Sequence, residues 1–229
     1  ASAVGKWAEG PTHWSQARRD SAEIAPPAAT TPEAVIQVYA ARAWSWRGIF
    51  GVHTWISAKQ PNADHYTRFE VMGWQLRRSD TAVRVTNGNP DGYWFGSKPE
   101  LLRDIRGPEA EALIPRIAAA AQSYPHAGTY RVWPGPNSNT FTAHIARQVP
   151  ELRLDLPPTA VGKDFIPEGG LFAKAPSGTG YQLSLFGLAG VMLALEEGVE
   201  VNLLGLTLGI DLKNPALKLP GVGRIGFPD

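Results

Sequence analysis

Four short segments in the first half of the chain predict β-strands, because they are rich in β-branched and aromatic residues or, as in residues 66–74, alternate apolar and polar positions. The segments are residues 34–42, 49–58, 66–74 and 82–85. Gln60-Pro61-Asn62-Ala63-Asp64, a turn-forming sequence, separates the second segment from the third. Because strands that follow one another through short connections usually pair, we expect these four to form an antiparallel meander.

Two later segments have the period of an amphipathic helix. Gly107-Pro108 and the acidic residues after it predict a helix start, and the apolar residues that follow predict a helix over residues 108–123. Phe141, Ile145 and Val149 are spaced four apart and predict a second helix over residues 138–149. By the same spacing Ser138 lies on the apolar stripe of this helix, so we expect its side chain to face the sheet.

Beyond Leu152 the helical period is lost, and proline and glycine interrupt the chain. Two apolar runs, residues 181–195 and 199–212, flank Glu196-Glu197-Gly198 and predict one long β-hairpin that is apolar on both faces. Such a hairpin can be buried in the domain, or it can present one face to a membrane surface or a partner protein. We expect the remaining residues, 215–229, to form a Gly/Pro-rich coil.

These elements predict an α+β fold, with an antiparallel meander sheet packed against a helix and a C-terminal apolar β-hairpin extension. Residues 1–33 are rich in Ala, Pro and Ser and predict an extended N-terminal arm. We therefore divide the chain into the arm, an α+β core over residues 34–150, and a loop and hairpin extension over residues 151–229.

Composition narrows the possible functions. The chain has 229 residues with 22 Lys and Arg against 21 Asp and Glu, and it has no run of like charge, which disfavours nucleic-acid binding. It contains no cysteine, which excludes disulfides, thiolate metal sites and thiol catalysis and fits an oxidising compartment. Ala1-Ser2-Ala3 is typical of the residues beside a signal-peptidase site, so we expect export to the periplasm or cell envelope after removal of a leader.

Membrane attachment is expected to be peripheral, because no stretch of 18 consecutive apolar residues is present. The hairpin over residues 181–212 and the arm over residues 1–33 are the segments expected to contact a membrane surface or a membrane-protein complex. No metal-ligand spacing and no phosphate-binding glycine loop is found, so the sequence predicts neither a metal nor a cofactor.

Ser138 is the first candidate functional residue. The rigid loop Trp133-Pro134-Gly135-Pro136-Asn137 delivers it to the start of a helix. Free N–H groups and the helix dipole at such a position stabilise a developing anion, which suits a nucleophile. An Asn or Ser after a proline loop is also the ordinary N-cap of a helix, and both interpretations remain open.

His53 is the second candidate, because it lies in the middle of a predicted strand, where a polar ring requires a partner. A strand-borne base facing a helix-borne nucleophile is a common catalytic geometry, although His53 is equally compatible with a hydrogen-bonded core residue. His65 and Glu70 are the candidates for a third, orienting residue. If the hairpin is centred on residues 62 and 63, Glu70 pairs near Trp55 and comes closer to His53 than His65 does, but a register shift of one residue reverses the face, so both candidates remain open.

The chain from about Thr31 to Gly226 resembles a bacterial family known as the domain of unknown function number 3750. Four strings carry the resemblance: Val38-Tyr39-Ala40-Ala41-Arg42, Gly48-Ile49-Phe50-Gly51-Val52-His53-Thr54-Trp55, Trp133-Pro134-Gly135-Pro136-Asn137-Ser138-Asn139-Thr140-Phe141 and Pro176-Ser177-Gly178-Thr179-Gly180-Tyr181. The family name implies no activity.

Residues 34–149 also resemble, more distantly, the circularly permuted papain-like proteins of the NlpC type, including the lecithin:retinol acyltransferase-like branch. In those proteins a strand histidine precedes a nucleophilic cysteine at a helix start. The resemblance gives His53 the role of that histidine and places Ser138 where the cysteine stands. A serine hydroxyl ionises far less readily than a thiol, so the site either reacts with His53 as general base or only binds.

Two functions follow from these observations. In the first, the protein is a binding or accessory subunit with a degenerate papain-like site, at a membrane or in a membrane complex of the cell envelope. In the second, it is a serine-dependent hydrolase or acyltransferase that acts on an amide or ester, such as a peptidoglycan peptide or a lipid acyl group.

Overall fold

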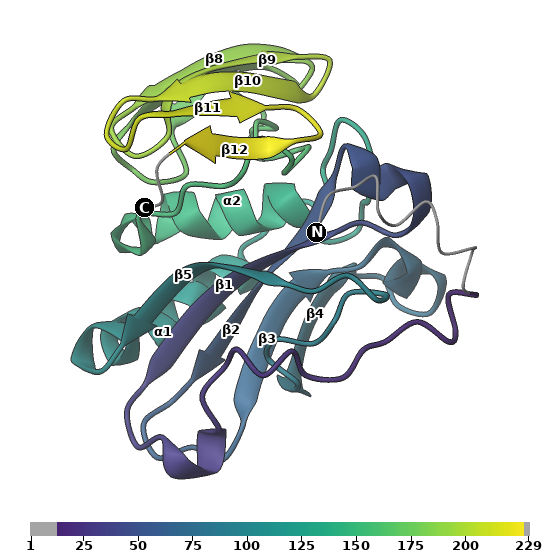
Figure 1. The fold of residues 1–229 in the computed structure, drawn as a ribbon, viewed down its shortest axis with the longest axis vertical. Helices are drawn as coiled ribbons and strands as arrows, with labels where there is room; N and C mark the ends of the chain where they lie inside the picture. The colour runs from purple at the N-terminus through teal and green to yellow at the C-terminus, as the bar shows by residue number, and fades with distance from the viewer. Residues whose placement is uncertain (1–12, 227–229) are drawn as a thin grey trace.

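The predicted meander forms one of two antiparallel sheets in the computed structural model, which describes residues 13–226 (Figure 1). Four strands pair in chain order, and a fifth, which the sequence did not predict, joins the far side of β1, giving the order β4-β3-β2-β1-β5. The strands of this sheet are β1 Val35–Arg42, β2 Val52–Lys59, β3 Tyr66–Val71, β4 Val83–Gly88 and β5 Glu100–Arg106. Four short 3-10 helices lie between the elements, η2 Ala28–Thr30, η3 Ser45–Ile49, η4 Gly73–Arg77 and η5 Pro150–Leu152.

Both predicted helices are confirmed. α1 spans Pro108–Gln122, with Pro108 in its first turn and Gly107 as its N-cap at a φ of 70°, a conformation that glycine adopts without strain. α2 spans Ser138–Gln148. No helix in residues 13–226 combines the length and the apolarity needed to cross a bilayer.

α2 lies between the two sheets (Figure 1). Its apolar side chains Phe141 and Ile145 belong to the main core with α1 and the inner face of the five-stranded sheet. On its other side, Arg147 donates hydrogen bonds to the Lys163 carbonyl and to the side chain of Gln182 in the second sheet. Nine of the eleven residues of α2 are buried, because the helix is covered on both sides.

The prediction of a single C-terminal hairpin is wrong, because residues 172–226 form a second sheet. Instead of one long hairpin, the chain makes a seven-stranded meander in the order β12-β11-β10-β9-β8-β7-β6. Its strands are β6 Phe172–Lys174, β7 Gly180–Leu185, β8 Ala189–Ala194, β9 Gly198–Leu203, β10 Leu206–Asp211, β11 Ala216–Leu219 and β12 Gly223–Gly226. Leu204 and Gly205 both have positive φ, the geometry of a tight hairpin turn, and Phe186 and Gly187 also have positive φ.

The predicted coil over residues 215–229 is likewise wrong for the residues that form β11 and β12, and residues 227–229 lie outside the described chain. The chain turns at Gly221, which has a φ of 74°. Each of these strands has only four residues, which is too short for a reliable alternation, and proline and glycine lie between and beside them, which explains why the sequence pattern did not predict them.

The seven-stranded sheet has its polar side chains inside, contrary to the prediction of two apolar faces. One cross-strand row runs through Gln182, Met192 and Glu200 to Lys218, and a second joins Asn202 to Thr207. All six side chains are buried. Successive residues of a strand point to opposite faces, so the apolar residues between them point away from the rest of the molecule.

An ionic network fixes this inner face. Lys218 Nζ donates to Glu200 at 3.0 Å and to Asp155 at 2.6 Å, and Lys163 donates to the other oxygen of Glu200. Asp164, next to Lys163, accepts a hydrogen bond from Asn202 at 2.6 Å. Because residues 155–164 belong to the loop after α2, these contacts attach the second sheet to the rest of the fold.

The described part of the arm lies against loop 89–97. The carboxylate of Asp91 accepts hydrogen bonds from the Ser21 hydroxyl and from the backbone N–H groups of Ile24 and Ala25. Ile24 packs against the aromatic cluster of Tyr39 and Trp55 on the face of the five-stranded sheet opposite the main core. Residues 1–12 of the predicted arm lie outside the described residues.

The α2 start depends on Asn137. Its side-chain oxygen accepts the backbone N–H groups of Asn139 and Thr140, and its amide nitrogen donates to the carbonyls of Val132 and Val161, each at 3.0 Å. Asn137 is therefore the N-cap and also the link between two loops.

We predict that Asn137→Ala lowers the free energy of unfolding by about 2–3 kcal/mol, because the cap is lost and two carbonyls lose their donor. Urea unfolding at neutral pH measures this change. Asn87→Ala, which removes an exposed asparagine from β4, serves as the control and is expected to change stability by less than about 0.5 kcal/mol. An equal effect of the two substitutions would contradict the prediction.

Candidate functional site

The sequence predicted that His53 and Ser138 face each other, but β2 presents His53 and the contacts to α2 on opposite faces. Thr54 hydrogen-bonds α2 through the Asn139 side chain at 3.0 Å and the Thr142 hydroxyl at 2.9 Å, so its side chain points toward the helices. His53 and Trp55 alternate with Thr54 and therefore point to the opposite face, where their rings lie 5.8 Å apart. Ser138, at the start of α2, and the side chain of His53 therefore lie on opposite sides of the five-stranded sheet.

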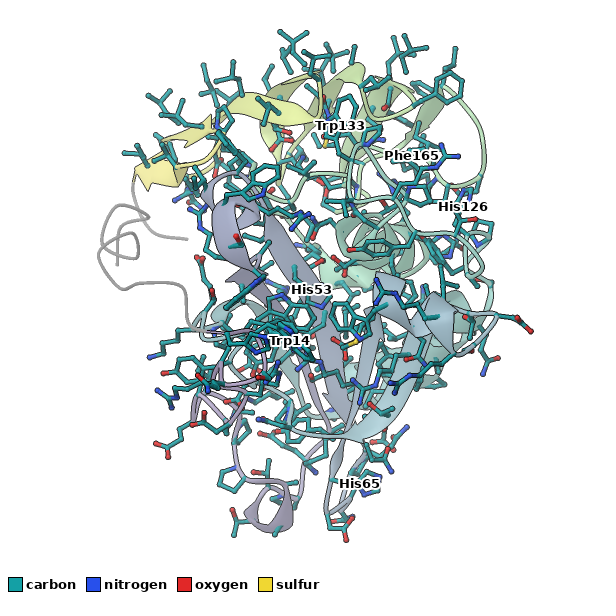
Figure 2. The ribbon with its side chains drawn as sticks, turned by 90° about the vertical axis from the view of Figure 1, so that its right-hand side faces the viewer. Trp14, His53, His65, His126, Trp133 and Phe165 are labelled. Carbon is teal, nitrogen blue, oxygen red and sulfur yellow. The ribbon has the colours of Figure 1, made fainter. Side chains whose placement is uncertain are left out.

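His53 and Glu70 form a buried pair on that opposite face, and Figure 2 shows His53 near the middle of the molecule. His53 Nε2 lies 3.2 Å from a carboxylate oxygen of Glu70, and Arg68 donates to the same oxygen at 2.8 Å. Arg84 approaches the other oxygen at 3.5 Å. The strand register, with Ile56 opposite Phe69, is the one in which Glu70 comes next to His53.

Aromatic rings enclose this pair. The imidazole of His53 stacks on Trp94 with the ring centroids 3.6 Å apart, and the guanidinium of Arg68 lies 4.1 Å from the centre of the Trp55 ring. Trp74 extends the stack on the far side of Trp94. Contacts of this kind bury the ring faces and hold the imidazole in one orientation.

The protonation of the pair follows from its surroundings. Burial lowers the pKa of His53, and the hydrogen bond and charge of Glu70 offset this effect only in part. Burial alone would raise the pKa of Glu70, but the hydrogen bond from His53 and the charge of Arg68 outweigh it and lower the pKa. A neutral imidazole therefore donates its Nε2 proton to an ionised carboxylate.

Ser138 is placed in a different environment. It begins α2 and is buried, as its position on the apolar stripe predicted. Its carbonyl lies 3.4 Å from the Thr54 hydroxyl. Burial raises the pKa of the nearby Tyr130 phenol, and a hydrogen bond with Ser138 opposes that rise. The structure brings His53 and Glu70 together and does not bring Ser138 to them.

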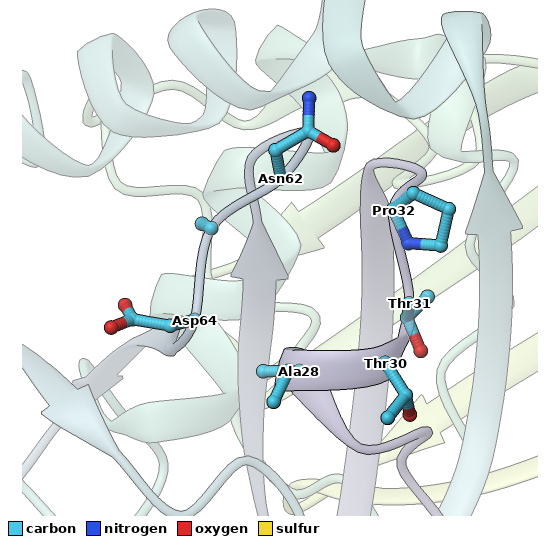
Figure 3. Close-up of a pocket in the computed structure, with 8 residues that line it drawn as sticks. Ala28, Thr30, Thr31, Pro32, Asn62 and Asp64 are labelled. Atoms are coloured by element: carbon cyan, nitrogen blue, oxygen red, sulfur yellow. The ribbon is translucent and has the colours of Figure 1, made fainter.

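His65 lies at the other end of β2 from His53. It precedes β3 and hydrogen-bonds the neighbouring Asp64 at 2.7 Å, with half of its side chain exposed. β2 runs from Val52 to Lys59, a span of roughly 20 Å at about 3.3 Å per residue, so His65 cannot orient His53. An open pocket of about 330 Å³ lies beside it, lined by residues 28–32 and 62–64 (Figure 3).

This pocket offers Asp64 as its one titratable lining group, so it has no combination of acid, base and nucleophile. Among residues 13–226, no three His, Asp or Glu side chains are placed to hold a metal ion. Around His53 the geometry supports a neutral imidazole that Glu70 and Trp94 hold in one orientation.

The outer face of the seven-stranded sheet is the most distinctive surface of the molecule. One cross-strand row runs from Tyr181 through Leu193, Val199 and Ile210 to Leu217, and the next runs from Phe172 to Leu208. Figure 2 shows these side chains projecting from the top of the molecule, drawn almost wholly as carbon. The outer face comprises Phe172, Tyr181, Leu183, Leu185, Val191, Leu193, Val199, Val201, Leu203, Leu206, Leu208, Ile210, Leu217 and Ile225, exposed by 37% to 63%.

The sequence pattern predicted that both faces are apolar, so it did not distinguish the outer face from the polar inner face. The separating pattern is the alternation of large aliphatic residues with Gln182, Ser184, Glu200 and Asn202. Alanine and glycine at other inner positions, such as Ala194, hide the alternation and make both faces look apolar.

Comparison with known proteins identifies the family. Residues 33–165, more than half of the chain, match the DUF3750 family, which is described as a protein of unknown function. The chain belongs to the DUF3750 family. The match confirms the first of the two resemblances.

The DUF3750 region contains the five-stranded sheet, both helices, His53, Glu70 and Ser138, and it ends before the seven-stranded sheet begins. No curated protein and no solved structure matches the chain. The permuted papain-like assignment therefore gains no support from the comparisons and stays a prediction, as does the division of the chain into three parts.

The pKa of His53 predicts a pH dependence of stability. Because its pKa is lower in the folded than in the unfolded chain, the unfolded chain binds more protons below about pH 6.5, and stability falls as the pH falls through this range. Replacing the imidazole by an amide, His53→Gln, is expected to flatten the decrease between pH 7.5 and 5.5, by up to about 1.4 kcal/mol per pH unit.

Urea unfolding of both proteins across this range measures the difference. His65→Gln is the matched control, because it removes an exposed histidine, and it should keep the slope of the wild type. A His53→Gln protein whose stability falls as steeply as that of the wild type would show that the His53 pKa is not lowered.

Proposed function

We propose that this DUF3750 protein is a membrane-docking protein of the cell envelope, and that the outer face of its seven-stranded sheet lies on the surface of a lipid bilayer. The observation that supports the proposal is the reversed polarity of the sheet. Its charged side chains are buried and paired, while its aliphatic side chains remain exposed. Leaving such a face in water costs free energy, which a cover of hydrocarbon would recover.

The size of the face supports a functional role. Four of the seven strands have six residues and the other three have three or four. At about 4.8 Å between strands and about 3.3 Å per residue, the face has an area on the order of 550 Å². The largest apolar patch of a typical monomer is roughly 300–600 Å² and is often functional. Leu195, Leu204 and Leu212 in the turns are more than 65% exposed and enlarge the patch further.

The chemistry of the face favours lipid over a protein partner. Protein interfaces carry about one hydrogen bond per 100–200 Å², so a face of this area would be expected to offer several polar groups. On the strand positions of the outer face, the Tyr181 hydroxyl and the Lys174 ammonium at one corner are the polar groups within the described residues. Hydrocarbon requires none, and within the sheet the backbone groups are already paired.

The alternative function, a serine-dependent hydrolase or acyltransferase, has no supporting observation. It needs the Ser138 hydroxyl next to the imidazole of His53. The imidazole of His53 hydrogen-bonds Glu70, on the face of β2 opposite to the one that Thr54 presents to α2, where Ser138 lies. Export to the cell envelope remains part of the proposal. Residues 13–33, the described part of the arm, present no apolar face comparable to the outer face of the seven-stranded sheet.

The proposal predicts binding to vesicles of phosphatidylcholine, which carry no net charge. We expect wild-type protein to sediment with such vesicles, and we expect Leu193→Gln combined with Val201→Gln to lower the partition coefficient at least about tenfold, because each substitution places an amide in hydrocarbon. Both side chains point outward and are exposed, so the fold should tolerate the changes.

Val85→Gln is the matched control. Val85 is an exposed valine on the edge strand β4 of the other sheet, and its substitution should leave vesicle binding unchanged. Analytical ultracentrifugation without lipid tests the main rival occupant, a second copy of the chain. A stable dimer that the Leu193 and Val201 substitutions dissociate, together with no vesicle binding, would overturn membrane docking.

A further inference from the structure

One end of the seven-stranded sheet collects segments that are far apart in the sequence. Because strand direction alternates, the turns β7–β8, β9–β10 and β11–β12 all lie at this end. Leu204 in the second turn donates its N–H to the Leu188 carbonyl in the first, and its own carbonyl accepts the Trp133 indole N–H at 2.8 Å. Figure 2 shows Trp133 against the sheet.

The third turn contacts the segment that contains η3. Arg42 donates to the Val222 carbonyl at 3.2 Å. A Cβ atom at Gly221 would lie 3.2 Å from the Ile49 carbonyl oxygen and 3.7 Å from the ring of Phe50, so the turn lies close against residues 49–50. Two parts of the DUF3750 region, residues 44–50 and 131–133, therefore join the three turns in one surface, which we call the anchor end.

The anchor end is apolar and aromatic. Its exposed side chains are Trp46, Phe50, Val132, Trp133, Phe186, Leu204 and Val222, each at least 46% exposed. Phe186 and Leu204 directly follow Leu185 and Leu203 of the outer face, so exposed apolar residues extend from that face into the anchor end. At the opposite end the turns expose Leu195 and Leu212 with the charged Glu196 and Lys213 directly after them, whereas the anchor end adds exposed aromatic rings.

The charges of the anchor end have one sign. Arg47 is exposed and lies 5.2 Å from the ring of Trp46, and Arg131 is exposed two residues before Trp133. Residues 43–50, 127–137 and the three turns contain no aspartate or glutamate. At the opposite end of the sheet, by contrast, Lys213 is paired with Glu196 at 2.7 Å.

We infer that the anchor end inserts first and binds anionic phospholipids, with the two tryptophans in the interfacial layer and the two arginines at the lipid phosphates. The inference rests on the proposed membrane docking and adds the orientation and the headgroup class. Indole rings favour the layer between headgroup and hydrocarbon, because they combine an apolar body with a polar N–H. A basic side chain near an anionic leaflet adds further attraction, which salt weakens.

The first test compares vesicles of phosphatidylcholine alone with vesicles that contain 30% phosphatidylglycerol. We expect wild-type binding to be stronger on the anionic vesicles, and we expect Arg47→Gln with Arg131→Gln to remove most of that gain, about fivefold for each arginine. The matched control is Arg77→Gln with Arg78→Gln, which removes two exposed arginines near η4 and should keep the gain.

The second test locates the tryptophans. Brominated phosphatidylcholine quenches indole fluorescence at the membrane, so wild-type fluorescence should fall on binding, and Trp46→Phe with Trp133→Phe should lose most of the quenching. Trp14→Phe is the control and should retain the quenching, because Trp14 is an exposed tryptophan of the arm that lies away from the seven-stranded sheet (Figure 2).

The outcomes separate the two proposals. If the outer-face substitutions Leu193→Gln and Val201→Gln abolish vesicle binding but the arginine and tryptophan variants of the anchor end behave like the wild type, membrane docking stands and the anchor end is overturned. If wild-type protein binds neither kind of vesicle, both proposals fail.

Discussion

The buried ion pairs of Lys218 and Lys163 with Glu200 determine how the second half of the molecule is arranged. Once these charges pair between the sheet and the loop after α2, they cannot be turned toward water without breaking the network. A strand has only two faces, so fixing its charged residues on the inside sends the alternate residues outside. The exposed aliphatic surface is therefore a direct consequence of the charged interior.

This arrangement differs from that of the five-stranded sheet, where apolar side chains such as Ile36 and Ile56 pack against the helices in the usual way. α2 lies between the mainly apolar inner face of the five-stranded sheet, to which Thr54 adds hydrogen bonds, and the polar inner face of the second sheet. Arg147, on the side of the second sheet, donates to backbone carbonyls and to Gln182. The helix thus joins two layers of opposite polarity, and its burial on both sides accounts for the burial of Ser138.

The alternation of side chains between the two faces of a strand also explains why His53 and Ser138 do not form one site. His53 and Thr54 are neighbours in the sequence, yet one meets Glu70 and Trp94 while the other meets α2. The sequence placed Glu70 beside His53 only if the hairpin is centred on residues 62 and 63, and the observed register, with Ile56 opposite Phe69, meets that condition. Ser138 could be placed at a buried helix start from its spacing to Phe141. Whether the helix covers the face that carries His53 is not encoded in either pattern.

The sequence by itself determined the local elements: both helices, with their starts at a proline and after a capping asparagine, and the first four strands of the meander. Local steric preferences and hydrogen-bonding patterns specify these features within a few residues. The tertiary structure alone decided which face of each strand is covered, because that depends on partners distant in the chain. For residues 181–212 those partners are Lys163, Asp164 and Lys218, and their charges turn the polar face of an apparently apolar segment inward.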